Sequence, residues 1–161
     1  MIVHAGLIAA FLAGGWRGVL IRGEAGAGKS DLALRCLDHG FRLVADDRTL
    51  VWACEGGLYG RAPDSLAGLM EIRGLGVVPE PPVPFCRIVL SVRCGSVERM
   101  PEPAVENYVG LSLPALNLLP LESSAPAKLR RALQHLGAGA EGAYQDALAA
   151  GALPQPGGDS R

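Results

Sequence analysis

The sequence predicts a single α/β domain, with a mixed sheet and flanking helices arranged around a phosphate-binding loop. Three observations predict this fold class. An apolar run, Gly18–Arg22, leads directly into a glycine-rich loop, and a helical pattern follows that loop. A second apolar run, Phe41–Ala45, ends in two adjacent acids, Asp46 and Asp47. The length of 161 residues suits one domain and is too short for two.

The composition is that of an ordinary globular protein, with 49% hydrophobic and 19% charged residues. A net charge of −1 gives no broad attraction to nucleic acid or to an anionic membrane, so we expect neither as a partner. The apolar start, Met1–Leu12, lacks the basic region and cleavage site of a signal peptide. The scattered cysteines favour buried thiols in a reducing cytoplasm, where we expect the protein to reside: Cys36, Cys54, Cys86 and Cys94.

The glycine-rich loop fits the pattern G-x-x-x-x-G-K-S. Its eight residues are Gly23, Glu24, Ala25, Gly26, Ala27, Gly28, Lys29 and Ser30. Glycines let backbone N–H groups surround a phosphate chain, Lys29 supplies positive charge to its oxygens, and Ser30 supplies a hydroxyl to Mg²⁺. The pattern indicates a site for a nucleoside triphosphate, the alternative being a glycine turn without a ligand.

The elements around the loop follow from apolar periodicity. Ile2–Ala5 predicts an edge strand, and the apolar stretch after it ends in a turn at Gly14 and Gly15. After the loop we expect a helix over Asp31–His39 with one apolar face, which stops at Gly40.

The pair Asp46-Asp47 follows the strand Phe41–Ala45. In open α/β sheets ligands bind at the carboxyl ends of strands. Two carboxylates beside a triphosphate can act as metal ligand and general base. The alternative is that the two acids are simply the polar end of the strand and cap a turn.

The middle of the chain predicts strands and turns. Arg48–Cys54 and Leu58–Arg61 form a hairpin, and a short helical turn opens at Pro63 with Asp64 or Ser65 as its cap. In Met70–Pro79, an acid and an arginine alternate with glycines between apolar segments. This predicts a backbone that closely approaches a ligand, or a strand with a bulge.

The last third predicts one further buried strand and one helix. Arg87–Val92 is a strand after a proline-rich link, and Val109–Leu121, interrupted by prolines, predicts an edge strand with turns. Ser124 is expected to cap a helix over Ala125–Leu136. We expect residues 1–136 to form the catalytic domain and residues 137–161 a flexible tail.

Four motifs together resemble the catalytic, C-terminal domain of HPr kinase/phosphorylase, in its short proteobacterial form without the N-terminal domain. They are Val3-His4, the glycine loop, Arg42–Asp47 and the run Glu71-Ile72-Arg73-Gly74-Leu75-Gly76, the signature of that family. The resemblance covers about residues 2–135. It implies a nucleotide-binding fold related to phosphoenolpyruvate carboxykinase and a homo-oligomer, a hexamer in the family.

The resemblance also implies an activity and roles for residues. Members transfer phosphate from ATP, with Mg²⁺, to a serine of the phosphocarrier HPr of the phosphotransferase system, and can reverse the step by phosphorolysis. Lys29 matches the residue that holds the phosphates, while Ser30 and Glu71 match Mg²⁺ ligands. Asp47 matches the catalytic base, His4 a histidine that contacts Asp47 or the phosphate, and Asp46 a supporting acid.

Two positions depart from the family pattern. Ala5 follows His4 where the family usually has glycine, and Gly110–Pro120 lacks the arginine that long members carry downstream of the signature. Arg73, Arg99 or Lys128 could supply that cation. Two other functions stay open: a kinase for a small molecule, and a regulatory module that senses a nucleotide with little turnover.

Overall fold

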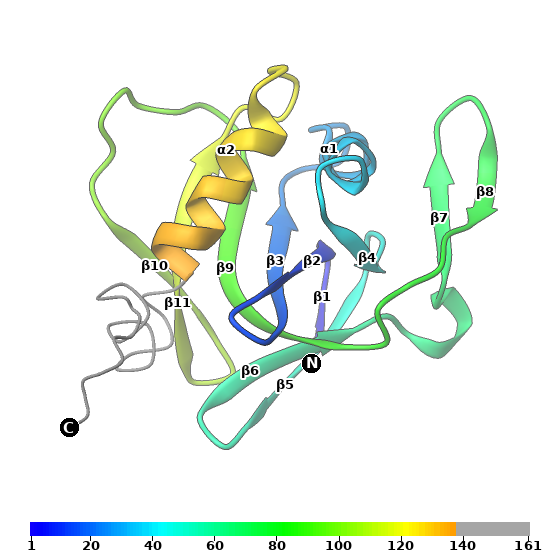
Figure 1. Ribbon diagram of the computed structural model, residues 1–161, viewed down its shortest axis with the longest axis horizontal. Helices are drawn as coiled ribbons and strands as arrows, with labels where there is room; N and C mark the ends of the chain where they lie inside the picture. The colour runs from blue at the N-terminus through cyan, green and yellow to red at the C-terminus, as the bar shows by residue number, and fades with distance from the viewer. Residues whose placement is uncertain (138–161) are drawn as a thin grey trace.

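The computed structural model describes residues 1–137, and Figure 1 shows its arrangement. A large mixed sheet dominates the domain. Its strands are β1 (Ile2–Val3), β2 (Gly6–Leu12), β3 (Gly15–Arg22), β4 (Arg42–Ala45), β5 (Thr49–Cys54), β6 (Gly57–Arg61), β9 (Cys86–Cys94), β10 (Ala104–Tyr108) and β11 (Leu111–Leu118). A separate two-stranded hairpin consists of β7 (Leu69–Ile72) and β8 (Gly76–Pro79).

The path through the large sheet is β1-β5-β6-β9-β3-β2-β4. β3 is parallel to β9 and antiparallel to β2, which in turn is antiparallel to β4. Consequently β3, β4 and β9 run in the same direction, and their carboxyl ends lie at the same edge of the sheet. β6 pairs with the first residues of β9 and β11 with the last, so the sheet branches along β9.

Two helices cover one face of the sheet. They are α1 (Lys29–Leu37) and α2 (Ala125–Ala132), which continues as a π-helical turn, Leu133–Gly137. Leu32 of α1 and Leu129 of α2 pack in one core cluster with residues of β2, β3 and β9. A second cluster lies on the other face, where β5, β6, β10 and β11 contribute. β3 is buried on both faces, as its continuous apolar run predicts.

The fold class predicted from the sequence is confirmed, and most strands lie where they were expected. The helix after the loop runs over Lys29–Leu37 rather than Asp31–His39, because the Cys36 carbonyl accepts from the N–H groups of His39 and Phe41 and ends it. The second helix ends at Ala132 and widens into the π-helical turn. The predicted tail beyond Gly137 lies outside the described residues.

Three local expectations were wrong. Pro63, and not Asp64 or Ser65, precedes the 3₁₀ turn Asp64–Leu66, and the Asp64 carboxylate instead accepts from Arg61 at 2.8 Å. Cys54 is exposed, since it ends β5 beside the hairpin turn.

The third concerns β11, which is covered by β10 and is therefore not an edge strand. Pro114 is compatible with this position because the ladder with β9 begins one residue later, at Ala115.

No helix within residues 1–137 is long and apolar enough to cross a membrane.

Candidate active site

The glycine loop joins the carboxyl end of β3 to the start of α1 (Figure 1). Gly26 and Gly28 adopt φ angles of 81° and 102°, in the left-handed region that favours glycine. The Ala27 N–H donates to the Glu24 carbonyl at 3.0 Å, which closes a turn. The loop thus presents backbone directly before a helix N-terminus, where partial positive charge gathers.

Lys29 is the first residue of α1, and only 8% of its surface is exposed. Its Nζ donates to the Glu24 carbonyl at 3.1 Å, so the side chain folds back over the loop. An ammonium group carries three donor protons, and one carbonyl accepts one of them. The Lys29 ammonium therefore lies against the loop with donors available for anionic oxygens.

Asp46 connects the helix of the loop to the β7–β8 hairpin. It directly follows β4, and its Oδ1 accepts from the Ser30 hydroxyl at 2.9 Å. Its Oδ2 accepts from the Glu71 backbone N–H at 3.0 Å. A hydroxyl and a carboxylate are oxygen ligands that suit Mg²⁺. The contact between Ser30 and Asp46 thus places two such ligands together beside the loop.

Asp47 is held by His4, whose Nε2 lies 2.8 Å from Asp47 Oδ1. The pairing of β1 with β5 explains this contact. Val3 pairs with Thr49, so the next residue, His4, lies near the segment just before Thr49, which contains Asp47. Both side chains reach solvent, with exposed fractions of 64% for His4 and 50% for Asp47. Asp47 has a φ of 68°, an uncommon conformation for a residue other than glycine. Its carboxylate is oriented and remains accessible.

The signature run forms the β7–β8 hairpin, which projects at one side of the domain in Figure 1. Ile72 ends β7 and Gly76 begins β8, with Arg73, Gly74 and Leu75 at the tip. Leu75 is 74% exposed. Only the backbone of Glu71 contacts the acid pair: within residues 1–137, no hydrogen bond or ion pair reaches its carboxylate or the Arg73 guanidinium.

The structure brings His4, Ser30, Asp46 and Asp47 together at one edge of the sheet. No hydrogen bond or ion pair within residues 1–137 joins the acid pair to Arg73, Arg99 or Lys128. Lys128 donates instead to Glu122 at 2.6 Å, and Arg99 lies in an exposed loop. In the part of the chain that the structure describes, no three side chains of His, Cys, Asp or Glu gather into a metal site. A metal here would need further oxygens from a ligand such as a triphosphate.

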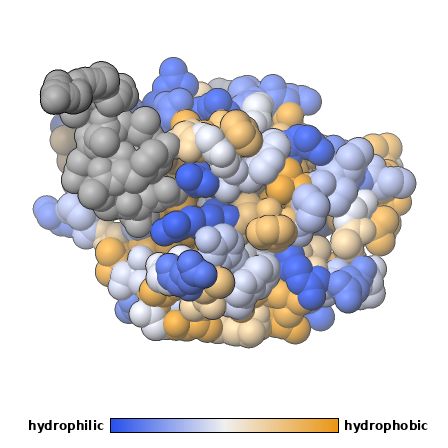
Figure 2. Space-filling model, turned by 60° about the horizontal axis from the view of Figure 1, so that its bottom comes forward, coloured by the Kyte–Doolittle hydropathy of each residue, from blue (hydrophilic) through white to orange (hydrophobic). Residues whose placement is uncertain are grey.

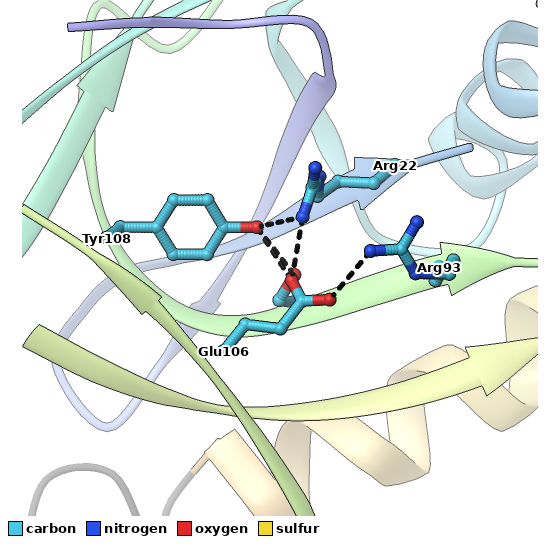
Figure 3. A network of polar contacts seen from close by, with 5 residues as sticks. Arg22, Arg93, Glu106 and Tyr108 are labelled. Atoms are coloured by element: carbon cyan, nitrogen blue, oxygen red, sulfur yellow. Dashed lines mark hydrogen bonds and ion pairs between the residues drawn. The ribbon is translucent and has the colours of Figure 1, made fainter. Parts of the chain in front are cut away.

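The sequence reasoning missed a polar network at the entrance to the loop, shown in Figure 3. Glu106 of β10 accepts from Ser91 at 2.6 Å, from Tyr108 at 2.7 Å and from Arg22 and Arg93 at 3.2 Å each. Arg22 and Arg93 are register partners at the ends of β3 and β9. Arg22 directly precedes Gly23, so the network fixes the strand end from which the loop starts. The sequence feature that could have indicated this network was Arg22, an arginine at the end of an otherwise apolar strand.

Glu106 is expected to contribute acid-sensitive stability. Burial raises the pKa of its carboxyl, but hydrogen bonds from Ser91 and Tyr108 and the Arg22 charge outweigh burial and lower the pKa to about 2. A pKa lowered by folding stabilises the protein above the ordinary value near 4.5, and this stabilisation is lost as the pH falls toward 2. After allowance for solvent screening, we expect a contribution of about 2 kcal/mol near neutral pH.

Urea unfolding of the wild type and of Glu106→Gln at pH 5.5 and pH 3 measures this effect. The free energies of unfolding should differ most at pH 5.5, and the difference should shrink at pH 3. An equal difference at both pH values would mean that the charge of Glu106 contributes nothing and that only its shape matters.

This chain is similar to known proteins in sequence and in fold. Residues 2–80 match the family model for the HPr Serine kinase C-terminal domain. HPr kinase/phosphorylase of Clostridium tetani is 42% identical over 76 residues, which are 47% of this chain and 25% of that protein. The Limosilactobacillus reuteri (strain DSM 20016) enzyme of the same name is 53% identical over 62 residues, 38% of this chain and 19% of that protein. The matched part thus spans a quarter or less of these relatives.

A solved structure of the Hpr(Ser) kinase/phosphatase from Coxiella burnetii superposes with a TM-score of 0.66 at 27% sequence identity. The match covers 81% of this chain and 96% of that one. It supports the mixed α/β fold, and together with the family match it confirms the resemblance drawn from the sequence motifs.

Proposed function

We propose that this domain is an ATP-dependent protein-serine kinase, because residues 2–80 match the family model for the HPr Serine kinase C-terminal domain. Its substrate would be a serine of an HPr-like phosphocarrier of the phosphotransferase system. The observation that carries the proposal is the meeting of two contacts at the ends of β3 and β4. Ser30 of the loop bonds Asp46, and the next residue, Asp47, is held by His4.

In this proposal the loop amides and Lys29 bind the phosphates of ATP. Ser30 and Asp46 fit a Mg²⁺ ion, and Glu71 lies beside them because its backbone is bonded to Asp46. When bound, Mg²⁺ neutralises charge on the phosphate oxygens. The residues of this chain contribute alignment and positive charge, which phosphoryl transfer needs more than covalent participation.

Asp47 would act as the general base. The substrate serine oxygen forms a bond to the γ-phosphorus, the bond from that phosphorus to the bridging oxygen of ADP breaks, and the serine proton passes to the Asp47 carboxylate. His4 is a positioning residue, because it contacts the carboxylate through Nε2 and so orients it. In the reverse direction inorganic phosphate would attack phosphoserine, giving pyrophosphate, while Asp47 returns the proton to the serine oxygen.

A second candidate function is a nucleotide-sensing module with little turnover. The observation that favours it is that the cations considered for the transition state make no polar contact with the acid pair within residues 1–137. Gly110–Pro120 contains no arginine. Moreover, no hydrogen bond or ion pair within residues 1–137 joins Arg73, Arg99 or Lys128 to the acid pair. The two functions differ in turnover and not in nucleotide binding.

By the same family relation we propose a cytoplasmic homo-oligomer, with a hexamer as the expected assembly. Apolar side chains exposed on the projecting β7–β8 hairpin support association with another protein surface. Leu75 is 74% and Val77 65% exposed. Single apolar residues on a surface are ordinary, but two together on a projecting hairpin form a contact point.

The test mixes the protein with ATP, Mg²⁺ and the HPr-like phosphocarrier from the same genome, and follows the carrier by intact mass spectrometry. The proposal predicts one added phosphate, mapped to a serine. Subsequent addition of inorganic phosphate would remove it if phosphorolysis operates. Measurable ATP binding without phosphorylation of the carrier would overturn the kinase and favour the sensing module.

A further inference from the structure

A groove of about 540 Å³ lies at the opposite end of the sheet from the glycine loop. Its lining includes residues at or near the starts of the parallel strands β3, β9 and β4, whereas the candidate active site lies at their carboxyl ends. The proline-rich link before β9 forms another wall. The bottom of the domain in Figure 1 comes forward in Figure 2, where strongly hydrophilic side chains lie among hydrophobic ones.

The groove concentrates positive charge. Three arginines line it, Arg17, Arg42 and Arg87, and no carboxylate among the described residues does. Arg17 and Arg87 are direct register partners on the parallel strands β3 and β9, so their side chains leave the sheet side by side. The whole chain has a net charge of −1, so this cluster is a local feature and not a general basic surface. Guanidinium groups present planar donors that match phosphate and carboxylate oxygens.

Three aromatic residues line the groove beside these arginines. Tyr59 is the register partner of Arg87 on the other side, and Phe85 is exposed from the link. Trp16 completes the set, with the Arg42 guanidinium 5.8 Å from its ring centroid. Such rings offer flat apolar surfaces on which a planar group stacks. The groove therefore combines anion recognition with stacking surfaces.

We propose that this groove binds a small organic anion, a phosphate ester with a planar, aromatic body. Its phosphate would lie among Arg17, Arg42 and Arg87, and its planar part against Tyr59, Phe85 and Trp16. This site is separate from the glycine loop, and the proposal does not depend on the kinase activity.

The chain contains its own reporters for the test. It has two tryptophans, of which Trp16 lines the groove and Trp52 lies 6.0 Å from Tyr59 between ring centroids. Titration with phenyl phosphate, followed by tryptophan fluorescence, should show saturable binding. Phenol should give no saturable change at the same concentrations, because it lacks the phosphate group. Inorganic phosphate should bind about tenfold more weakly than phenyl phosphate, because it lacks the aromatic ring.

Variants assign the signal to the groove. Arg87→Gln and Arg42→Gln should each weaken phenyl phosphate binding about tenfold or more, as expected for the loss of a charge-assisted hydrogen bond. Arg87→Lys and Arg42→Lys keep the positive charge and serve as controls for the effect of substitution on folding. They should bind phenyl phosphate more tightly than the glutamine variants. Arg99→Gln, in an exposed loop outside the groove, and Lys29→Ala, in the glycine loop, should bind like the wild type.

The proposal is overturned if both glutamine variants fold, by circular dichroism, and retain wild-type affinity. It is also overturned if Lys29→Ala abolishes the signal, since the anion would then bind at the glycine loop. Equal affinities for phenyl phosphate and inorganic phosphate would contradict the role of the rings.

Discussion

Asp47→Asn is expected to slow phosphoryl transfer by about 10²- to 10⁴-fold, the range that a general base contributes, while ATP still binds. Asparagine has the size of aspartate but cannot accept the serine proton as a carboxylate does. Its amide can still meet His4, so the local fold should persist. Single-turnover transfer to the phosphocarrier gives the rate, and calorimetric titration gives the ATP affinity.

Asp38→Asn is the matched control for this variant. Asp38 is an exposed acid at the carboxyl end of α1 and is not part of the acid pair. Its replacement should leave the transfer rate and the ATP affinity unchanged. If Asp47→Asn transferred phosphate at the wild-type rate, Asp47 would not be the base. The two acids after β4 would then only cap the turn that follows the strand.

Lys29→Ala is expected to weaken ATP binding and to slow transfer. The buried ammonium group lies on the loop, 3.1 Å from the Glu24 carbonyl, in a position from which it can turn to phosphate oxygens. Charge-assisted hydrogen bonds contribute roughly 1.5–3 kcal/mol, so ATP affinity should fall about ten- to a hundredfold.

Lys128→Ala is the control for ATP binding, because Lys128 is the other lysine of the chain and is paired with Glu122 on an exposed surface. Its ATP affinity should equal that of the wild type. A Lys29→Ala protein with unchanged ATP affinity would contradict the assignment of the loop as the triphosphate site.

Much of the site could be predicted because local sequence carries it. The loop, the following helix and the acids after β4 each depend on short-range patterns of glycine, charge and apolar residues. The contact between His4 and Asp47 was implied by the family resemblance and not by any local pattern, since it depends on the pairing of β1 with β5.

What could not be predicted depends on non-local pairing. No sequence pattern near Ala104–Tyr108 predicts that this strand pairs with β11. That pairing places Glu106 beside the two arginines at the loop entrance. The same holds for the groove, where Arg17 and Arg87 lie 70 residues apart in sequence and become neighbours only through the β3–β9 ladder. Side chains that meet through sheet register leave no periodic signal in one sequence.

In the proposed complex, the triphosphate lies between the glycine loop and the acid pair. The most direct measurement is a crystal structure of this protein with Mg²⁺ and an ATP analogue that carries a β,γ-imido bridge. We expect phosphates within the loop, the metal at Ser30 and Asp46, and a terminal phosphoryl group that faces the Asp47 carboxylate. A nucleotide bound elsewhere, or one whose terminal phosphate points away from Asp47, would contradict this proposal.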